Sequence, residues 1–313
     1  MDTRKQYAPG SHPDLPPPPG TIGIVGWLHK NLFSSVGNSI LSVVTILFLY
    51  WLVTASAGWF VLDAVADASS RKECRTIDSG ACWAVIFKRI GQFVYGFYPH
   101  AERWRPDTAF IFLILAVAPL LYPNLPFRRQ LFWFSAVYPA FAYFLICGGI
   151  FGLPEVGTNK FGGFMLTMIV GVTGIGASLP IGIALALGRQ SRLLSVRVIS
   201  IAFIEFMRGV PLITLLFVAS TMLNYFLPPG TTFNLLMRVL IMVTFFASAY
   251  IAEVIRGGIQ AIPKGQYEAA AAMGLNYWQT TMLVTLPQAM KISIPGIVNT
   301  FIGLYKDTTL VVV

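Results

Sequence analysis

The chain has 313 residues, of which 56% are hydrophobic and only 11% are charged, and its formal net charge is +9. Soluble domains carry about 25% charged residues, so this composition argues against a soluble protein. It predicts an all-α membrane protein, a polytopic bundle of transmembrane helices. The basic excess fits cytoplasmic loops that face anionic membrane lipid. Nucleic acid is not expected as a partner, because no basic-aromatic module or basic helix is evident.

The N-terminal region divides into a polar tail, a first span and a long loop. Residues 1–36 are polar and rich in Pro and Gly, which predicts a disordered cytoplasmic tail. The apolar run 36–65 is too long and starts too late for a cleaved signal peptide, so an uncleaved span is expected. The following loop, 66–106, is polar at first and then aromatic and basic. Its second half is expected to lie along the membrane surface as an amphipathic segment.

Six further apolar runs have roughly the length that a helix needs to cross about 30 Å of hydrocarbon. They cover 107–122, 131–151, 162–188, 198–226, 234–256 and 290–313. Pro211 interrupts the fifth span and is expected to kink it. The last run reaches Val313 without a polar terminus, so a further C-terminal part is expected to be missing from the chain.

Basic residues orient the spans, because Lys and Arg concentrate in cytoplasmic loops. With the N-terminus in the cytoplasm, the basic residues of most loops also face the cytoplasm: Arg128, Arg129, Arg189, Arg192, Arg197, Arg256 and Lys264. The loop 66–106 disagrees, since it would be periplasmic and yet holds seven Lys and Arg. A surface helix tolerates basic residues, so the cytoplasmic N-terminus remains the preferred prediction.

The three cysteines divide between this loop and an apolar run. Cys74 and Cys82 lie in the 66–106 loop, where an oxidising periplasm would allow a disulfide. Spacing alone does not decide between bonded and free thiols, so both remain open. Cys147 lies in an apolar run and is expected to serve packing. No metal-site spacing appears, and no metal site is expected.

One segment, 263–287, carries a distinctive pattern. It contains Glu268-Ala269-Ala270, three residues, Gly274, nine residues, and then Val284-x-Leu286-Pro287. Pro263 and the alanine run predict a short helix, with Glu268 near its N-terminal turn, where negative charge is favoured. Gly274 permits a sharp turn into a second short helix. The pair would form a knob that fits a partner's cleft. The alternative for the segment alone is an ordinary amphipathic connector.

This spacing resembles the EAA loop shared by the permeases of bacterial ABC importers, and Val284 in place of Ile is the only departure. Four further stretches are also similar to the polar amino-acid branch of these permeases: 182–192, 203–217, 248–270 and 299–310. The resemblance implies a type I permease core over 161–313, with a cytoplasmic coupling loop at 257–287. The extra N-terminal spans within 37–160, with their periplasmic loop 66–106, resemble the larger permease of general L-amino-acid importers.

The resemblance implies transport of L-amino acids across the bacterial inner membrane by alternating access. It implies three partners: a cytoplasmic ATPase dimer, a second homologous permease in a heterodimer, and a periplasmic amino-acid-binding protein. No cofactor is expected on this chain, because it lacks the G-x4-GK[ST] phosphate loop, so ATP and magnesium belong to the ATPase. Coupling to the ATPase is expected at Glu268, Ala269, Ala270, Gly274 and Pro287.

The alternative functions are a stand-alone amino-acid carrier and an intramembrane enzyme. A stand-alone ion-coupled amino-acid carrier needs broken helices in repeated halves, and it has no use for the EAA loop. An intramembrane hydrolase needs a HExxH, G-x-S-x-G or paired intramembrane Asp pattern. None is present, so no catalytic residues are expected and the chain is not expected to be an enzyme. The amino acids carried, and which subunit holds them, stay open.

Charged residues inside the spans are costly and mark candidate sites. Glu205 with Arg208, and Glu253 with Arg256, repeat an E-x-x-R-G pattern in which partners three residues apart can meet. They predict ion pairs near the inner face, or alternatively a cytoplasmic gate or substrate contact. Deeper in the last span, Lys306 and Asp307 could bind the two charged ends of a zwitterion or neutralise each other. The candidate substrate-binding residues are Arg208, Lys306, Asp307, Asn299 and Thr308.

Overall fold

The computed structural model describes residues 23–76, 80–122, 124–149, 152–222, 225, 228 and 234–311. Regular structure in these residues is helical, apart from one isolated bridge between Val65 and Cys82. The predicted all-α fold is therefore confirmed. The chain forms two compact units, 1–89 and 90–313, which are described separately below.

The first unit holds four helical segments. They are α1 (Gly23–Asn31), α2 (Val36–Ala57) with a π-helical extension (Gly58–Leu62), α3 (Arg71–Thr76) and the first half of α4 (Ala84–Tyr95). The prediction of a disordered tail through residue 36 is wrong for 23–31, because this stretch carries enough apolar residues to form a helix beside α2. The Ser42 hydroxyl of α2 donates to the Leu32 carbonyl that follows α1. Residues 1–22 of the predicted tail lie outside the described residues.

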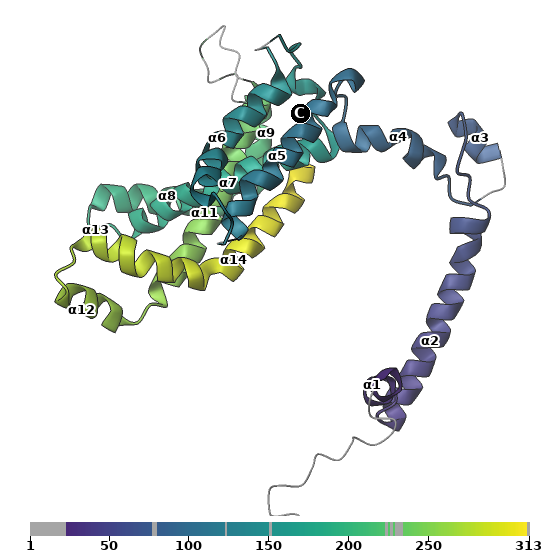
Figure 1. Ribbon diagram of the computed structural model, residues 1–313, viewed down its shortest axis with the longest axis horizontal. Helices are drawn as coiled ribbons and strands as arrows, with labels where there is room; N and C mark the ends of the chain where they lie inside the picture. Colours follow the sequence, from purple (N-terminus) through teal and green to yellow (C-terminus); the bar gives the residue numbers. More distant parts are fainter. Residues whose placement is uncertain are drawn as a thin grey trace, which may run out of the picture. The chain divides into compact units, whose positions relative to one another are not determined.

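The second unit is a bundle of long helices (Figure 1). They are α5 (Trp104–Leu121), α6 (Arg128–Cys147), α7 (Gly163–Arg189), α8 (Leu194–Gly209), α9 (Leu212–Phe217), α11 (Leu235–Gln260), α12 (Lys264–Ala272), α13 (Tyr277–Gln279) and α14 (Leu286–Asp307). Short 3-10 turns lie at His100–Glu102, Thr158–Lys160 and Thr308–Leu310, and π-helical turns lie at Val218–Met222 and Thr280–Thr285.

Helix α11 is the centre of this bundle, and it packs against α7, α8 and α14. Glycines let the neighbouring helices approach closely, as is common between membrane helices. A Cβ added to Gly182 would lie 2.6 Å from the Ile251 side chain, and one added to Gly174 would lie 3.1 Å from Val243. Close packing against α11 therefore accounts for glycine at both positions.

Residues on both sides of the predicted domain boundary at 160/161 contribute to one hydrophobic core. Tyr98, Ala109 and Ile146, from the predicted N-terminal part, are buried in one hydrophobic core with Val170 and Val243. The compact unit instead begins at residue 90. The segments 90–160 and 161–313 therefore belong to the same compact unit.

The membrane-spanning helices agree with the sequence in number. Among the described residues, six helices are long and apolar enough to cross a membrane: 36–62, 100–121, 128–147, 163–189, 235–260 and 277–310. The bent pair α8 and Leu212–Met222 makes a possible seventh, with 101° between its halves. The break follows from Pro211, which forces Val210 into an extended conformation (φ −101°, ψ 131°). The predicted kink is thus a complete break between two helices.

Candidate functional site

Helix α12 lies on the connection between α11 and the last long helix, at one end of the bundle (Figure 1). Its C-terminus is a Schellman motif. The Leu275 amide donates to the Ala270 carbonyl (3.1 Å) and the Gly274 amide donates to the Ala271 carbonyl (3.0 Å). Gly274 takes φ +73°, which is strained for any residue with a side chain. The glycine of the motif is therefore the stop signal of α12.

A start signal follows two residues later. Asn276 accepts from the Gln279 amide (2.9 Å), and the Gln279 side chain accepts from the Asn276 amide (3.0 Å), which forms a capping box. This helix continues without a gap to Leu310. The expectation of a second short helix is therefore wrong: the turn at Gly274 leads directly into the last span, because Asn276 caps that span.

Most of α12 is exposed, and Ala270 is its only buried residue. Glu268 and Ala269 are exposed, and Glu268 is the fifth residue of the helix, next to its first turn. One hydrogen bond ties α12 to α14, since Gln288 Nε2 donates to Gln266 Oε1 (3.0 Å). Pro287 lies in the first turn of α14, where proline is tolerated. A push on α12 would thus reach both α11 and α14.

Five charged residues gather where α7, α8 and α11 approach the α12 side of the bundle. Glu253 is the centre: its Oε1 lies 2.7 Å from Arg189 Nη1, and its Oε2 lies 2.8 Å from Arg256 Nη2 and 3.6 Å from Arg208 Nη1. Arg189 Nη1 also lies 2.9 Å from Glu205 Oε1. The group is called the charge cluster below. Its three arginines and two glutamates join three helices and leave one excess positive charge.

The charge cluster only partly matches the sequence-based pairs. Glu253 does pair with Arg256, three residues on. The expected pair of Glu205 with Arg208 is not formed: Glu205 pairs with Arg189, and Arg208 turns to Glu253 and the Tyr250 ring (5.6 Å to its centroid). Arg189, predicted to lie in the loop after the span 162–188, is the last residue of α7 and contacts Glu253, 64 residues away along the chain.

A cavity of about 270 Å³ lies between α11 and α14. It is lined by Phe246, Ala247, Tyr250, Asn299, Thr300, Gly303, Leu304 and Asp307. Tyr250 precedes the end of α11 by ten residues, so this cavity lies about 15 Å along the helix from its C-terminal end. An aromatic and aliphatic wall with few polar groups is typical of a small-molecule site.

The cavity brings together two of the five predicted substrate-binding residues, Asn299 and Asp307. Arg208 does not line it, but its guanidinium lies over the ring of the wall residue Tyr250. Lys306 is exposed and lies outside the lining, because consecutive residues of a helix point in different directions. Thr308 is buried, and its hydroxyl donates to the Tyr305 carbonyl (2.7 Å). The proposed joint action of Lys306 and Asp307 therefore lacks geometric support.

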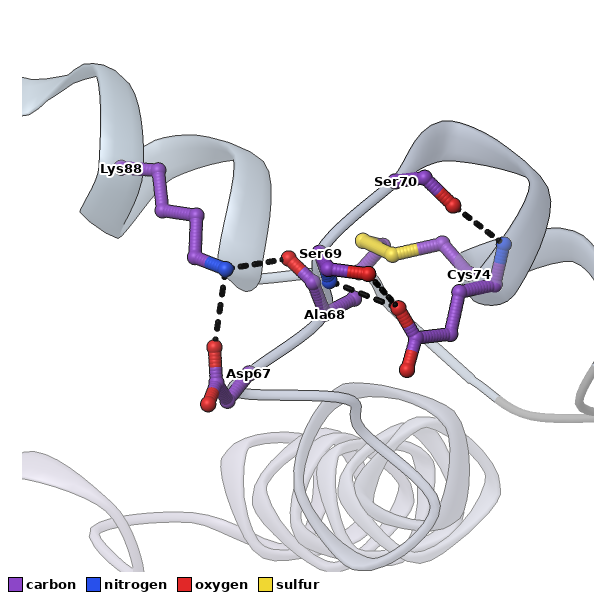
Figure 2. Close-up of a disulfide and its surroundings, with 8 residues drawn as sticks. Asp67, Ala68, Ser69, Ser70, Cys74 and Lys88 are labelled. Atoms are coloured by element: carbon purple, nitrogen blue, oxygen red, sulfur yellow. Dashed lines mark hydrogen bonds and ion pairs between the residues drawn. A yellow bond between two sulfur atoms is a disulfide. The ribbon is translucent and has the colours of Figure 1, made fainter.

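In the first unit, Cys74 and Cys82 form a disulfide with their Cα atoms 6.0 Å apart (Figure 2). The bonded alternative is the one present in the structure. Nearby, Lys88 Nζ of α4 lies 3.0 Å from Asp67 Oδ1 and donates to the Ala68 carbonyl (2.5 Å). The disulfide and these contacts fasten the loop to α4. The three or more His, Cys, Asp or Glu side chains that a metal site needs do not cluster anywhere in the described part of the chain.

The chain is similar to known membrane transport proteins. The family described as "Binding-protein-dependent transport system inner membrane component" matches residues 178–313. The chain is 46% identical to the glutamate/glutamine/aspartate/asparagine transport system permease protein BztC of Rhodobacter capsulatus, covering 95% of this chain and 83% of that protein. It is 47% identical to the inner membrane amino-acid ABC transporter permease protein YhdY of Escherichia coli, covering 97% and 82%.

A solved structure described as an amino acid ABC transporter with histidines is 29% identical over 46% of this chain and 66% of its own, with a TM-score of 0.42. The two relatives named above match both compact units, including the extra N-terminal helices. The similarity therefore extends well beyond the region 178–313 that the family pattern covers.

Proposed function

The chain belongs to the amino-acid permeases of binding-protein-dependent ABC importers, and from this premise we propose that α12 is the surface through which a separate ATPase drives transport. The observation that carries the proposal is the geometry of α12: an exposed helix with one buried residue, held between two spans by the Schellman turn at Gly274 and the capping box at Asn276. Such a helix can enter a partner's cleft and transmit force to α11 and α14.

The proposed partners are a cytoplasmic ATPase dimer, a second homologous permease and a periplasmic amino-acid-binding protein. ATP and magnesium are assigned to the ATPase. The similarity to permeases of this class supports these partners, because a binding-protein-dependent system needs a delivering protein and an energy source outside the membrane subunit.

We assign the N-terminus and α12 to the cytoplasm. A disulfide is expected on the oxidising, periplasmic face, and one span, α2, separates it from the N-terminus. Five crossings follow the disulfide loop before α12: α5, α6, α7, the pair α8–α9, and α11. With the pair α8–α9 counted as one crossing, the odd number of crossings supports a position of α12 on the face opposite the disulfide, where an ATPase acts.

The cavity between α11 and α14 is the proposed substrate contact on this chain. Asp307 offers a carboxylate for an α-ammonium group, and Asn299 and Thr300 offer hydrogen bonds. The charge cluster, with its excess positive charge, is assigned to the cytoplasmic side of the cavity. Arg208 of this cluster is proposed to bind the α-carboxylate of the amino acid when the transporter opens toward the cytoplasm. The name of the Rhodobacter relative suggests glutamate, glutamine, aspartate and asparagine as the first substrates to test.

The test is uptake of radiolabelled amino acids by proteoliposomes that contain the full complex. Asp307→Asn is expected to abolish uptake, and Arg208→Ala to reduce it at least tenfold, while both complexes assemble. The matched control is Lys306→Gln, since Lys306 neighbours Asp307 in sequence but lies outside the cavity lining. Normal uptake by both Asp307→Asn and Arg208→Ala would refute the proposed substrate contact. If Lys306→Gln loses as much uptake as Asp307→Asn, the loss does not depend on the cavity lining, and the cavity is not the substrate contact.

A further inference from the structure

Helix α4 presents its apolar side chains outward. At 100° per residue, Ile86, Phe87, Ile90 and Phe93 share an arc of about 120°. Their exposed fractions are 40%, 63%, 56% and 55%. Residues of the opposite arc include Lys88, Gln92 and Tyr95. An uncovered apolar stripe of this size on a short helix calls for a partner, because water is unfavourable around it.

The polar arc is fastened to the chain at both ends of the helix. At the N-terminal end, Lys88 bonds to Asp67 and the Ala68 carbonyl of the disulfide loop (Figure 2). At the C-terminal end, the Tyr95 hydroxyl donates to Asp107 Oδ1 of α5 (2.7 Å), and the Arg103 guanidinium lies 4.9 Å from the centroid of the Tyr95 ring. Two side chains of the polar arc, Lys88 and Tyr95, therefore contact protein groups, and both lie on the side of α4 opposite the apolar stripe.

Both neighbours of α4 along the chain are membrane spans. The stretch Val36–Leu62 precedes it and His100–Leu121 follows it, so α4 starts and ends on one face of the membrane. Phe97 and Trp104, between the stripe and the body of the second span, are 72% and 49% exposed. Aromatic side chains in this position are typical of the boundary between headgroups and hydrocarbon. The apolar stripe is thus continuous along the chain with a lipid-facing surface.

We propose that α4 lies in the plane of the membrane interface on the disulfide side, with Ile86, Phe87, Ile90 and Phe93 among the phospholipid acyl chains. An interfacial helix of this kind buries its apolar face about 5–10 Å into the boundary region. Lys88 and Arg89 lie outside this arc, at the level of the lipid phosphates. This arrangement explains why the periplasmic loop 66–106 holds basic residues, which usually concentrate in cytoplasmic loops. The fastened disulfide loop then holds the start of the helix at the surface.

The experiment measures the surroundings of spin labels on the full complex in lipid nanodiscs. A Cys147→Ala background removes the free cysteine and keeps the disulfide. Labels are attached at Phe87→Cys and, as the matched control, at Val85→Cys. Val85 is 53% exposed and lies on the polar arc of the same helical turn. Relaxation by oxygen reports lipid, and relaxation by a water-soluble nickel chelate reports solvent.

The proposal predicts that the label at Phe87 is at least threefold more accessible to oxygen than to the nickel chelate, relative to the label at Val85. Equal access of the chelate to both labels would overturn it, since the stripe would then face water. Shielding of the Phe87 label from both reagents would also overturn it, because a protein surface, such as a docked binding protein, would then cover the stripe. Repeating the measurement without the binding protein shows whether the binding protein or a permease subunit shields the Phe87 label.

Discussion

Replacing Glu253 with glutamine removes the carboxylate on which three arginines converge. The Glu253 side chain is 14% exposed, and its contacts to Arg189 and Arg256 are 2.7 and 2.8 Å long. In the variant, three guanidinium groups share only Glu205, so they repel one another where α7, α8 and α11 meet. Two charges 4 Å apart interact by about 4 kcal/mol at an effective dielectric constant near 20.

The expected loss of stability is on the order of 2–4 kcal/mol, because removing one partner from a buried pair leaves uncompensated charge. Glutamine keeps the volume of the side chain and can still accept one hydrogen bond, which holds the loss below that of a full truncation. Glu205→Gln is the matched control: its side chain is 55% exposed and has one arginine partner, so it should lose less than about 1 kcal/mol.

The assay is denaturant unfolding of the purified complex, followed by a double-mutant cycle. The cycle of Glu253→Gln with Arg189→Gln should give a larger coupling energy than the cycle with Arg208→Gln, since the distances are 2.7 and 3.6 Å. If Glu205→Gln destabilises the complex as much as Glu253→Gln, or if the two coupling energies are equal, Glu253 is not the centre of the charge cluster.

Three further predictions concern the turn and the loop. Gly274→Ala should weaken the stimulation of the ATPase, because a φ of +73° costs a residue with a side chain about 1–2 kcal/mol, and Gly274→Asn should be milder because asparagine tolerates this conformation. The added methyl would meet no neighbouring atom within 4 Å, so backbone strain is the only cost expected. A Gly274→Ala variant destabilised by much more than about 1–2 kcal/mol would contradict this explanation. Cys74→Ser opens a bridge between residues eight apart and should lower the local stability of the loop by about 2–3 kcal/mol. Limited proteolysis near Cys82 measures this, and unchanged cleavage would count against the bond. Hydrogen bonds from the Ser69 hydroxyl and amide lower the pKa of Glu73. The ionised carboxylate therefore stabilises the loop above the pKa that Glu73 has in the unfolded chain, and this stabilisation is lost as pH falls through the pKa of the folded loop. Protease protection should therefore decrease in acid in the wild type and stay flat in Glu73→Gln.

The spans and the position of α12 were predictable from the sequence because each depends on local composition. Apolar runs report helices that cross the membrane, and the pattern around Gly274 reports a helix stop. The capping box Asn276-x-x-Gln279 is a further local signal, and it begins the last span about 13 residues before the predicted start at residue 290. Local signals of this kind can be found without any tertiary information.

The partners of the charged residues were not predictable in the same way. The i, i+3 rule found the contact between Glu253 and Arg256, which belongs to a single helix. It gave the wrong partner for Glu205, because packing of α7 beside α8 brings Arg189 closer than Arg208. The cavity also depends on packing, since Tyr250 of α11 and Asp307 of α14 approach each other only in the folded bundle.

The most direct test of the central claim is ATPase activity of the purified complex with and without binding protein and amino acids. Wild type is compared with Gly274→Asp, which puts a negative charge at the C-terminal end of α12, where the helix dipole disfavours it. The control is Gly176→Ala, which adds a methyl in open space far from α12 along the chain. The account predicts that amino acids stimulate hydrolysis in wild type and Gly176→Ala, and that Gly274→Asp loses the stimulation or the ATPase itself. A complex that purifies without an ATPase, or a Gly274→Asp complex that behaves as wild type, would contradict the role of α12.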